Sequence, residues 1–265
     1  MAEFKVQGLK FKVVAFIIFE FLVLNFAPSR SSAELTIKAN HDHIKVDFFY
    51  HGDEVTVSGT SDPGVDIIVK IASPESHQVF KKKGKMAGLL WMNVGTLNFE
   101  NVPNLYFLHS TKRIEDILSF EEMDKEIIGY DALMRHTEIK PISAEGDKER
   151  WFKEFLRFKE ASRIYNVMSG DVIVNEKGNK QDYYIKLPWP YQAQPGKYTV
   201  TVYAVKDKRV AEKASTTVNV EQVGIVKTLA QMAKENGALY GIISIIVAIA
   251  AGFGVGMIFR KGGAH

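Results

Sequence analysis

The sequence predicts a mainly-β protein: an immunoglobulin-like antiparallel β-sandwich that carries an inserted helical layer and ends in one C-terminal transmembrane helix. Three observations favour this fold class. Apolar and polar residues alternate in two blocks near opposite ends of the chain, the period becomes helical between them, and a long run near the C-terminus is apolar throughout. We expect a signal peptide at residues 1–33 and an exported sandwich domain at 34–221, with its helical insertion at about 110–165. A juxtamembrane amphipathic helix at 222–236, a transmembrane helix at 237–259 and a cytoplasmic tail at 260–265 are expected to follow.

The N-terminal segment is predicted to be a cleaved signal peptide. Basic residues precede an apolar stretch, residues 13–26, which Glu20 interrupts and which is too short to span a bilayer comfortably. Ser31 and Ala33 place small residues at the two positions that a signal peptidase reads, so we expect cleavage before Glu34. An uncleaved second anchor is the alternative.

Both β blocks show the period-two alternation of half-buried strands. The first covers residues 34–71 and is divided by short turns such as Gly52-Asp53 and Asp62-Pro63-Gly64. No helical segment separates its strands, which argues against a parallel sheet. The second block covers residues 183–220, and Tyr198 begins one of its strands. Tyr198 is either the corner tyrosine of an immunoglobulin-like sandwich or an ordinary core tyrosine.

The segment between the blocks has a helical period. Ser119 and Glu122 form a capping-box pattern, and Trp151, Phe155 and Phe158 lie on one face of a longer helix. We expect this aromatic stripe to pack against the sheet, and a partner-binding groove is the alternative.

The apolar run at 237–259 is predicted to cross a membrane. Its 23 residues form a helix of roughly 34 Å, enough for a hydrocarbon core of about 30 Å. Arg260 and Lys261 follow it, and the positive-inside rule places such residues on the cytoplasmic side, so the sandwich domain lies on the other side. The preceding residues, 222–236, are amphipathic and are expected to lie in the headgroup layer.

Composition excludes several classes of function. The chain contains no cysteine, which excludes disulfides, thiol redox chemistry and thiolate metal sites. The chain has 34 basic residues, of which six fall in the predicted signal peptide and tail, and 31 acidic residues, of which two fall there. The rest of the chain therefore has 28 basic and 29 acidic residues. This near-neutral balance argues against a nucleic-acid partner.

No pattern of catalytic residues is visible. His41 and His43 are two apart and share one face of a strand, but two ligands do not make a zinc or copper site. The basic run 81–85 is expected to be a solvated hairpin tip. Phosphate loops, nucleophile elbows and His-Glu-x-x-His helices are absent from the sequence. We therefore expect no catalytic residue, no cofactor and no metal.

Two aromatic segments carry a resemblance to a known family. Residues 88–94 read Gly-Leu-Leu-Trp-Met-Asn-Val, and residues 102–106 read Val-Pro-Asn-Leu-Tyr. With Pro195-Gly196-Lys197-Tyr198 and the terminal Phe259-Arg260, they resemble the bacterial family called "putative transmembrane protein" of the alphaproteobacterial type, although the glycine here stands one place further from Trp91. The resemblance implies an envelope protein without an established activity. Family members are often encoded beside permeases resembling sulfite exporters, which implies a membrane partner.

The candidate interaction residues come from these segments and from the anchor. The anchor contributes small residues that are four positions apart. Such spacing can allow another helix to approach closely, and the alternative is that glycine and alanine are simply common in membrane spans. The candidates are Trp91, Asn93, Pro103, Tyr106, Gly252 and Gly256.

Three functions are compatible with this sequence. The first is a non-enzymatic, single-span protein of the bacterial inner membrane whose periplasmic sandwich binds an envelope partner, as an accessory to a sulfite-exporter-like permease or as a homo-oligomer through its anchor. The alternative is a periplasmic domain that captures a small anion or a metal ion and feeds a transporter, using the 81–85 lysines, the paired histidines and Trp91. The third is a hydrolase whose catalytic residues lie far apart in the sequence.

Overall fold

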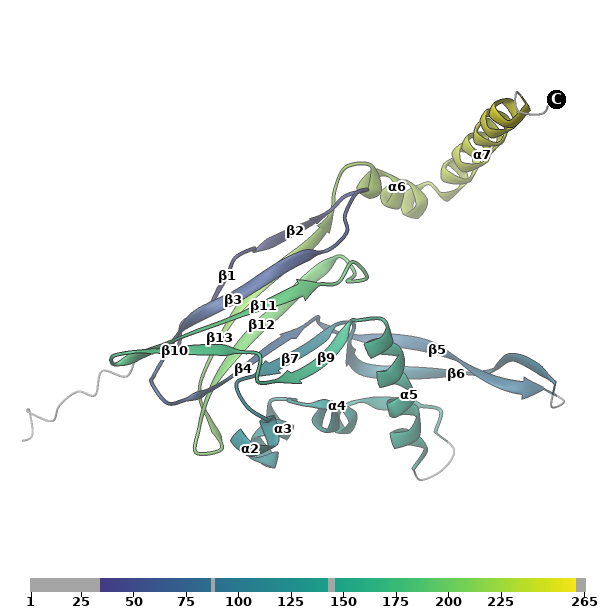
Figure 1. The fold of residues 1–265 in the computed structure, drawn as a ribbon. Helices are drawn as coiled ribbons and strands as arrows, with labels where there is room; N and C mark the ends of the chain where they lie inside the picture. The colour runs from purple at the N-terminus through teal and green to yellow at the C-terminus, as the bar shows by residue number, and fades with distance from the viewer. Residues whose placement is uncertain (1–33, 87–88, 143–145, 261–265) are drawn as a thin grey trace, which may run out of the picture. The chain divides into compact units, whose positions relative to one another are not determined.

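The computed structural model describes residues 34–86, 89–142 and 146–260, so the predicted signal peptide and residues 261–265 of the predicted tail lie outside the described residues (Figure 1). Strands predominate, and the predicted class, mainly β with inserted helices and an apolar C-terminal helix, is confirmed. The elements are β1 (Lys38–Ala39), β2 (His43–Val46), β3 (Asp53–Ser61), β4 (Asp66–Ala72), β5 (Glu75–Met86), β6 (Leu90–Pro103), β7 (Tyr106–Ser110), α2 (Ile114–Ile117), α3 (Phe120–Lys125), α4 (Tyr130–His136), β8 (Glu138–Lys140), α5 (Asp147–Ala161), β9 (Tyr165–Ser169), β10 (Ile173–Lys177), β11 (Lys180–Trp189), β12 (Gly196–Lys206), β13 (Arg209–Gln222), α6 (Gly224–Glu235) and α7 (Gly237–Arg260).

Two sheets pack face to face and enclose one hydrophobic core. The first sheet has the strand order β1-β3-β11-β10, and the second has the order β2-β13-β12-β4-β7-β9. In an immunoglobulin-like sandwich the last two strands lie in one sheet, beside the third strand of that fold. The arrangement here, with β12 and β13 beside β4 in the second sheet, is consistent with such a sandwich. The core contains aliphatic side chains from both inner faces together with Tyr183, Trp189 and Tyr198.

Tyr198 takes the position of the corner tyrosine. Its hydroxyl donates a hydrogen bond of 2.6 Å to the carbonyl oxygen of Gln194, four residues upstream, at the turn that leads into β12. The edge of its ring packs against Trp189, with 4.9 Å between the ring centroids. The tyrosine therefore joins the turn before β12 to the end of β11.

The second sheet is mixed, in contrast to the antiparallel sheet that the sequence favoured. Strand β2 pairs in parallel with β13, because the chain leaves the first sheet after β1 and crosses to the edge of the second. Strand β7 pairs in parallel with β9, and the helical insertion between them supplies the long crossover that a parallel pair requires. The inserted helices thus determine how β9 is placed beside β7.

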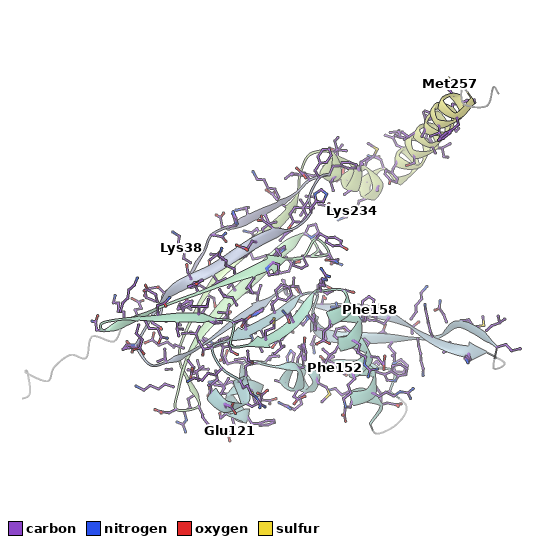
Figure 2. All side chains as sticks on the ribbon, in the orientation of Figure 1. Lys38, Glu121, Phe152, Phe158, Lys234 and Met257 are labelled. Atoms are coloured by element: carbon purple, nitrogen blue, oxygen red, sulfur yellow. The ribbon has the colours of Figure 1, made fainter. Side chains whose placement is uncertain are left out.

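A second core lies on the other face of the second sheet. Helices α2 to α5 and a third sheet, of order β5-β6-β8, cover this face. Phe155 of α5 stacks on Phe99 of β6 with ring centroids 4.6 Å apart, and it also contacts Phe80 of β5. Phe152 is buried but Phe158 is 54% exposed, so only part of the predicted aromatic stripe is a packing face (Figure 2).

Tyr106 holds the turn between α3 and α4. Ile127 in this turn has a left-handed backbone with φ of 50°, which is unfavourable for a β-branched residue. The Tyr106 hydroxyl donates to the Ile127 carbonyl at 3.0 Å and accepts from the Gly129 N–H at 2.9 Å. Tyr106 is buried, so these two bonds satisfy its hydroxyl and join it to the partly buried turn.

The chain ends in two consecutive helices. Helix α6 has 12 residues and α7 has 24, and Asn236 between them has a non-helical backbone. Within the described residues, one helix is long and apolar enough to cross a membrane: its segment Gly237–Met257 has a mean hydropathy of 2.3 and is not buried by the rest of the protein. This helix has the length that a bilayer requires.

We predict that Tyr106→Phe lowers the free energy of unfolding by about 1–3 kcal/mol, because it removes two hydrogen bonds to the turn and each contributes about 0.5–1.5 kcal/mol. Tyr184→Phe is the matched control, since Tyr184 lies at the surface of β11 and is expected to change stability by less than about 0.5 kcal/mol. Denaturant unfolding of the full chain in mild detergent measures both values. Equal stabilities of the two variants would show that the turn does not depend on this hydroxyl.

Candidate functional site

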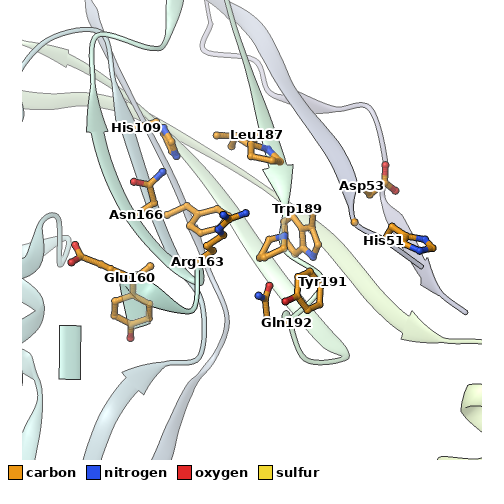
Figure 3. Close-up of a pocket in the computed structure, with 15 residues that line it drawn as sticks. His51, Asp53, His109, Glu160, Arg163, Asn166, Leu187, Trp189, Tyr191 and Gln192 are labelled. Carbon is orange, nitrogen blue, oxygen red and sulfur yellow. The ribbon is translucent and has the colours of Figure 1, made fainter. Parts of the chain in front are cut away.

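A cavity of about 650 Å³ opens where the end of the sandwich meets the turn between α5 and β9. This volume is in the range of small-molecule sites. Figure 3 shows side chains entering it from both sides, with Asn166 and Arg163 on one side and Trp189 and Gln192 on the other. We call it the His109 cavity, and its lining residues are His51, Gly52, Asp53, Phe107, His109, Glu160, Arg163, Tyr165, Asn166, Leu187, Pro188, Trp189, Pro190, Tyr191 and Gln192.

His109 is held in one orientation by Asp171. Its Nδ1 lies against the Asp171 carboxylate, and the histidine is 3% exposed. The parallel pairing of β7 with β9 brings the two together, since Gly170, just after β9, donates its N–H to the Ser110 carbonyl at 2.7 Å. Because a carboxylate only accepts hydrogen bonds, Nδ1 carries the proton of this bond, and in the neutral tautomer Nε2 keeps a lone pair. Nε2 is buried and has no hydrogen-bond partner within the described part of the chain.

Trp189 brings a buried donor to the same cavity. It is the last residue of β11, where it pairs with Asp53 of β3, and its ring is fixed by the contact with Tyr198. The indole Nε1–H is buried and also lacks a hydrogen-bond partner among residues 34–86, 89–142 and 146–260. Such buried groups normally find a partner, so the two unpaired atoms indicate a place for a ligand or for water.

Arg163 enters the cavity from a strained position. The N–H of Arg163 donates to the Glu160 carbonyl at 2.8 Å, and the N–H of Ile164 donates to the Lys159 carbonyl at 3.1 Å, which together form the Schellman motif that ends α5. Arg163 has a φ of 55° in this motif, where glycine is the usual residue. The strain is compatible with a functional use of the guanidinium.

The cavity offers hydrogen bonding without an evident nucleophile. Its lining contains no serine, threonine or cysteine among the described residues. Burial raises the pKa of Tyr165, which keeps its phenol neutral, and this hydroxyl already donates to the Pro103 carbonyl at 2.6 Å. The histidine–aspartate pair therefore has no hydroxyl or thiol beside it to activate in the manner of a serine or cysteine hydrolase.

The residues selected from the sequence lie elsewhere and are not brought together. Pro103 and Tyr106 are buried in the fold, and Asn93 is exposed on β6. Trp91 lies in β6 as well, opposite Lys85 of β5. Gly252 and Gly256 lie in α7 with open space beside both.

The other sequence candidates are also dispersed. The lysines of the 81–85 run are exposed along β5. His43 lies near Asp42 at the surface, with 3.3 Å between Nδ1 and the carboxylate, while His51 reaches the His109 cavity. In the described ranges of the chain, no three His, Cys, Asp or Glu side chains gather as metal ligands.

The comparisons with known proteins assign the chain to a family. Residues 34–261 match the family described as "Putative transmembrane protein (Alph_Pro_TM)". The chain belongs to this family, which confirms the resemblance seen in the sequence. Together with the apolar helix at 237–257, the family identifies a membrane protein. No curated protein matches the chain.

We predict that Arg163→Gly leaves the free energy of unfolding unchanged or raises it by up to about 1 kcal/mol, because glycine adopts a positive φ without the steric cost that arginine incurs. Arg157→Gly is the matched control: Arg157 is an exposed residue inside the same helix, where glycine costs about 1 kcal/mol. Denaturant unfolding in detergent compares them. A similar loss in both variants would mean that the Arg163 side chain stabilises the fold.

Proposed function

We propose that this protein is a non-enzymatic, membrane-anchored binding protein whose exported sandwich captures a small organic ligand in the His109 cavity. Three buried atoms, unpartnered within the described residues, belong to side chains that line this cavity: His109 Nε2, Trp189 Nε1 and Gln192 Oε1. The first two are the observation that supports this function. Each unsatisfied buried polar group costs about 1–3 kcal/mol, and a ligand that pairs with both offsets this cost.

The two atoms define the chemistry of the ligand. His109 Nε2 accepts a hydrogen bond and Trp189 Nε1 donates one, so the ligand carries at least one donor and one acceptor. Arg163 favours an acidic group, and Asp53 or Glu160 accommodates a basic one. Phe107 faces the same space and favours an apolar part.

The enzyme alternative has weaker support. A histidine oriented by an aspartate is part of many hydrolytic sites, but those sites also hold a nucleophile or a metal-bound water. The described lining of the His109 cavity contains no serine, threonine or cysteine, and its hydroxyl groups are those of Tyr165 and Tyr191. Binding therefore requires fewer additional assumptions than catalysis.

We further propose that the protein lies in the bacterial inner membrane, with its sandwich domain in the periplasm and its C-terminus in the cytoplasm. The basic pair after α7 supports this orientation, and the family match begins at residue 34, where signal-peptide cleavage is predicted. A captured ligand then needs a route across the membrane, which favours a permease as the partner. The sulfite-exporter-like permeases implied by the family resemblance are candidates for this partner.

The first test is to look for retained ligand. Full-length protein is purified in mild detergent and denatured, and the released small molecules are identified by mass spectrometry. We expect a molecule in stoichiometric amount with the wild type and with the control Arg157→Ala, and at least a tenfold loss with Trp189→Phe and with Arg163→Gly. The same molecule at equal amounts in all four proteins would contradict binding in the His109 cavity, and so would a wild type that releases none.

The second test concerns the anchor as a partner surface. Small residues at Gly252 and Gly256 allow a second helix to pack closely in lipid. We predict that Gly252→Ile with Gly256→Ile reduces crosslinks of α7 to itself or to a permease in native membranes, without reducing membrane insertion. Ala250→Ile with Gly254→Ile is the matched control, because these residues have the same spacing on the opposite face of the helix. Unchanged crosslinks in the first variant would mean that this face contacts only lipid.

A further inference from the structure

Lys159 is a buried cation outside the His109 cavity. It lies on α5 and is 3% exposed. Its Nζ donates a long hydrogen bond, 3.4 Å, to the Asn104 carbonyl and lies 5.3 and 5.4 Å from the ring centroids of Phe155 and Tyr165. Among the residues that the structure describes, no carboxylate lies within ion-pair distance of it. Its charge is therefore compensated only by a carbonyl dipole and two aromatic faces.

A second cavity adjoins this lysine. Its volume is about 390 Å³, and its described lining contains several amide side chains, Lys159 and His77, but no aspartate or glutamate. His77 is itself paired with Glu100, with 2.6 Å between Nδ1 and the carboxylate. We call this space the Lys159 cavity. It shares Gln192 with the His109 cavity and is otherwise separately lined.

Lys70 is a partly buried lysine that has an acidic residue nearby. Its Nζ donates to the Glu126 carbonyl, and the Glu126 carboxylate raises the pKa of Lys70 against the effect of burial, which lowers it to about 8. Lys159 has no acidic neighbour that acts in this way, and burial lowers its pKa to about 8 as well. Neither lysine has a carboxylate within ion-pair distance among the described residues, but Lys159 is the less exposed of the two. An unpaired buried charge is costly, so an anion beside Lys159 lowers the free energy of the folded protein.

We propose that the Lys159 cavity binds a small oxyanion, the sulfate, phosphate or carboxylate group of a solute, and that the Lys159 ammonium supplies the opposite charge. The acid-free lining removes the repulsion that would otherwise exclude an anion. The Gln78 and Asn104 amides already donate within the protein, so Gln192 and Gln194 are the lining amides that can donate hydrogen bonds to the anion's oxygens. This inference does not depend on a ligand in the His109 cavity, because the two sites use different charged groups.

The pH dependence of binding follows from the groups that face Lys159. Tyr165 of β9 packs against it and Tyr198 of β12 lines the same cavity; burial raises the pKa of Tyr198 to about 12 and raises that of Tyr165 as well, so both remain neutral up to pH 10. His77 of β5, which is paired with Glu100 of β6, is the remaining titratable side chain on the described lining. Lys159 is thus the group expected to lose its charge between pH 7.5 and pH 9.5, and the bound anion in turn holds the proton on Lys159.

The test is calorimetric titration of the full chain in mild detergent with sodium sulfate, with sodium phosphate and sodium acetate in parallel, at constant ionic strength. Sulfate does not change its own charge in this pH range. We expect saturable sulfate binding at pH 7.5 that weakens at least fivefold at pH 9.5. Lys159→Met should weaken it at least tenfold at pH 7.5, whereas Lys70→Met, the control at a partly buried lysine outside the lining of both cavities, should bind like the wild type.

Lys159→Arg keeps the positive charge and is expected to retain binding at pH 9.5. If Lys159→Met does not fold, the pH dependence of the wild type and of Lys159→Arg decides the question. Saturable binding that Lys159→Met leaves unchanged, or wild-type binding that does not weaken between pH 7.5 and pH 9.5, would overturn the proposal. So would the absence of saturable binding of all three anions to the folded wild type.

Discussion

The second sheet, of order β2-β13-β12-β4-β7-β9, is buried on both faces, and the rest of the structure depends on this constraint. In β12, Val200 and Val202 are fully buried in the sandwich core, while Tyr203 and Val205, of the opposite parity, are buried in the second core. A shift of one residue in the register of such a strand exchanges the residues of the two cores, so the pairing of β12 with β4 and β13 is strongly specified. Strand β7 pairs with β4, and it carries His109 to the cavity.

Local signals in the sequence were read correctly, whereas features that depend on distant contacts were not. Ser119 accepts a hydrogen bond from the Glu122 N–H as the capping pattern predicts, because both partners lie within one turn of helix. The alternation in β11 identifies its buried face for a similar reason, since that strand has one exposed side. In β4 the alternation was only half of the pattern: Ile68 is also buried, in the second core, whose other side is formed by later strands and helices of the chain. The third sheet and the parallel pairing of β7 with β9 could not be read from periodicity, which says nothing about which strand lies beside which.

The candidate site was less predictable than the fold because it is assembled from several elements. His109 was visible as a histidine, but its partner Asp171 lies 62 residues later and becomes a neighbour only when β9 pairs with β7. Trp189 reads as a core tryptophan in a proline-rich stretch, and its unpaired Nε1 is a property of the packed structure. One signal was present in the sequence. Arg163 stands at the end of a long amphipathic helix where glycine is common, and such a departure from local preference is typical of functional positions.

The same energetic argument applies to both cavities. A domain without disulfides must obtain its stability from its core, and here both cores are extensive. The folded protein nevertheless contains four groups that cost free energy when no ligand is bound. They are the unpaired Nε2 of His109, the unpaired indole N–H of Trp189, the strained backbone of Arg163 and the buried Lys159. These four groups lie along the two cavities that share Gln192, at the end of the sandwich beside α5. Other groups of the same kind lie elsewhere: within the part of the chain that the structure describes, the buried hydroxyls of Tyr50 and Tyr130 also lack a partner, and neither residue lines these two cavities. What distinguishes the four groups is the open space beside them, because a ligand can enter that space and complete the interactions that the folded protein leaves unsatisfied.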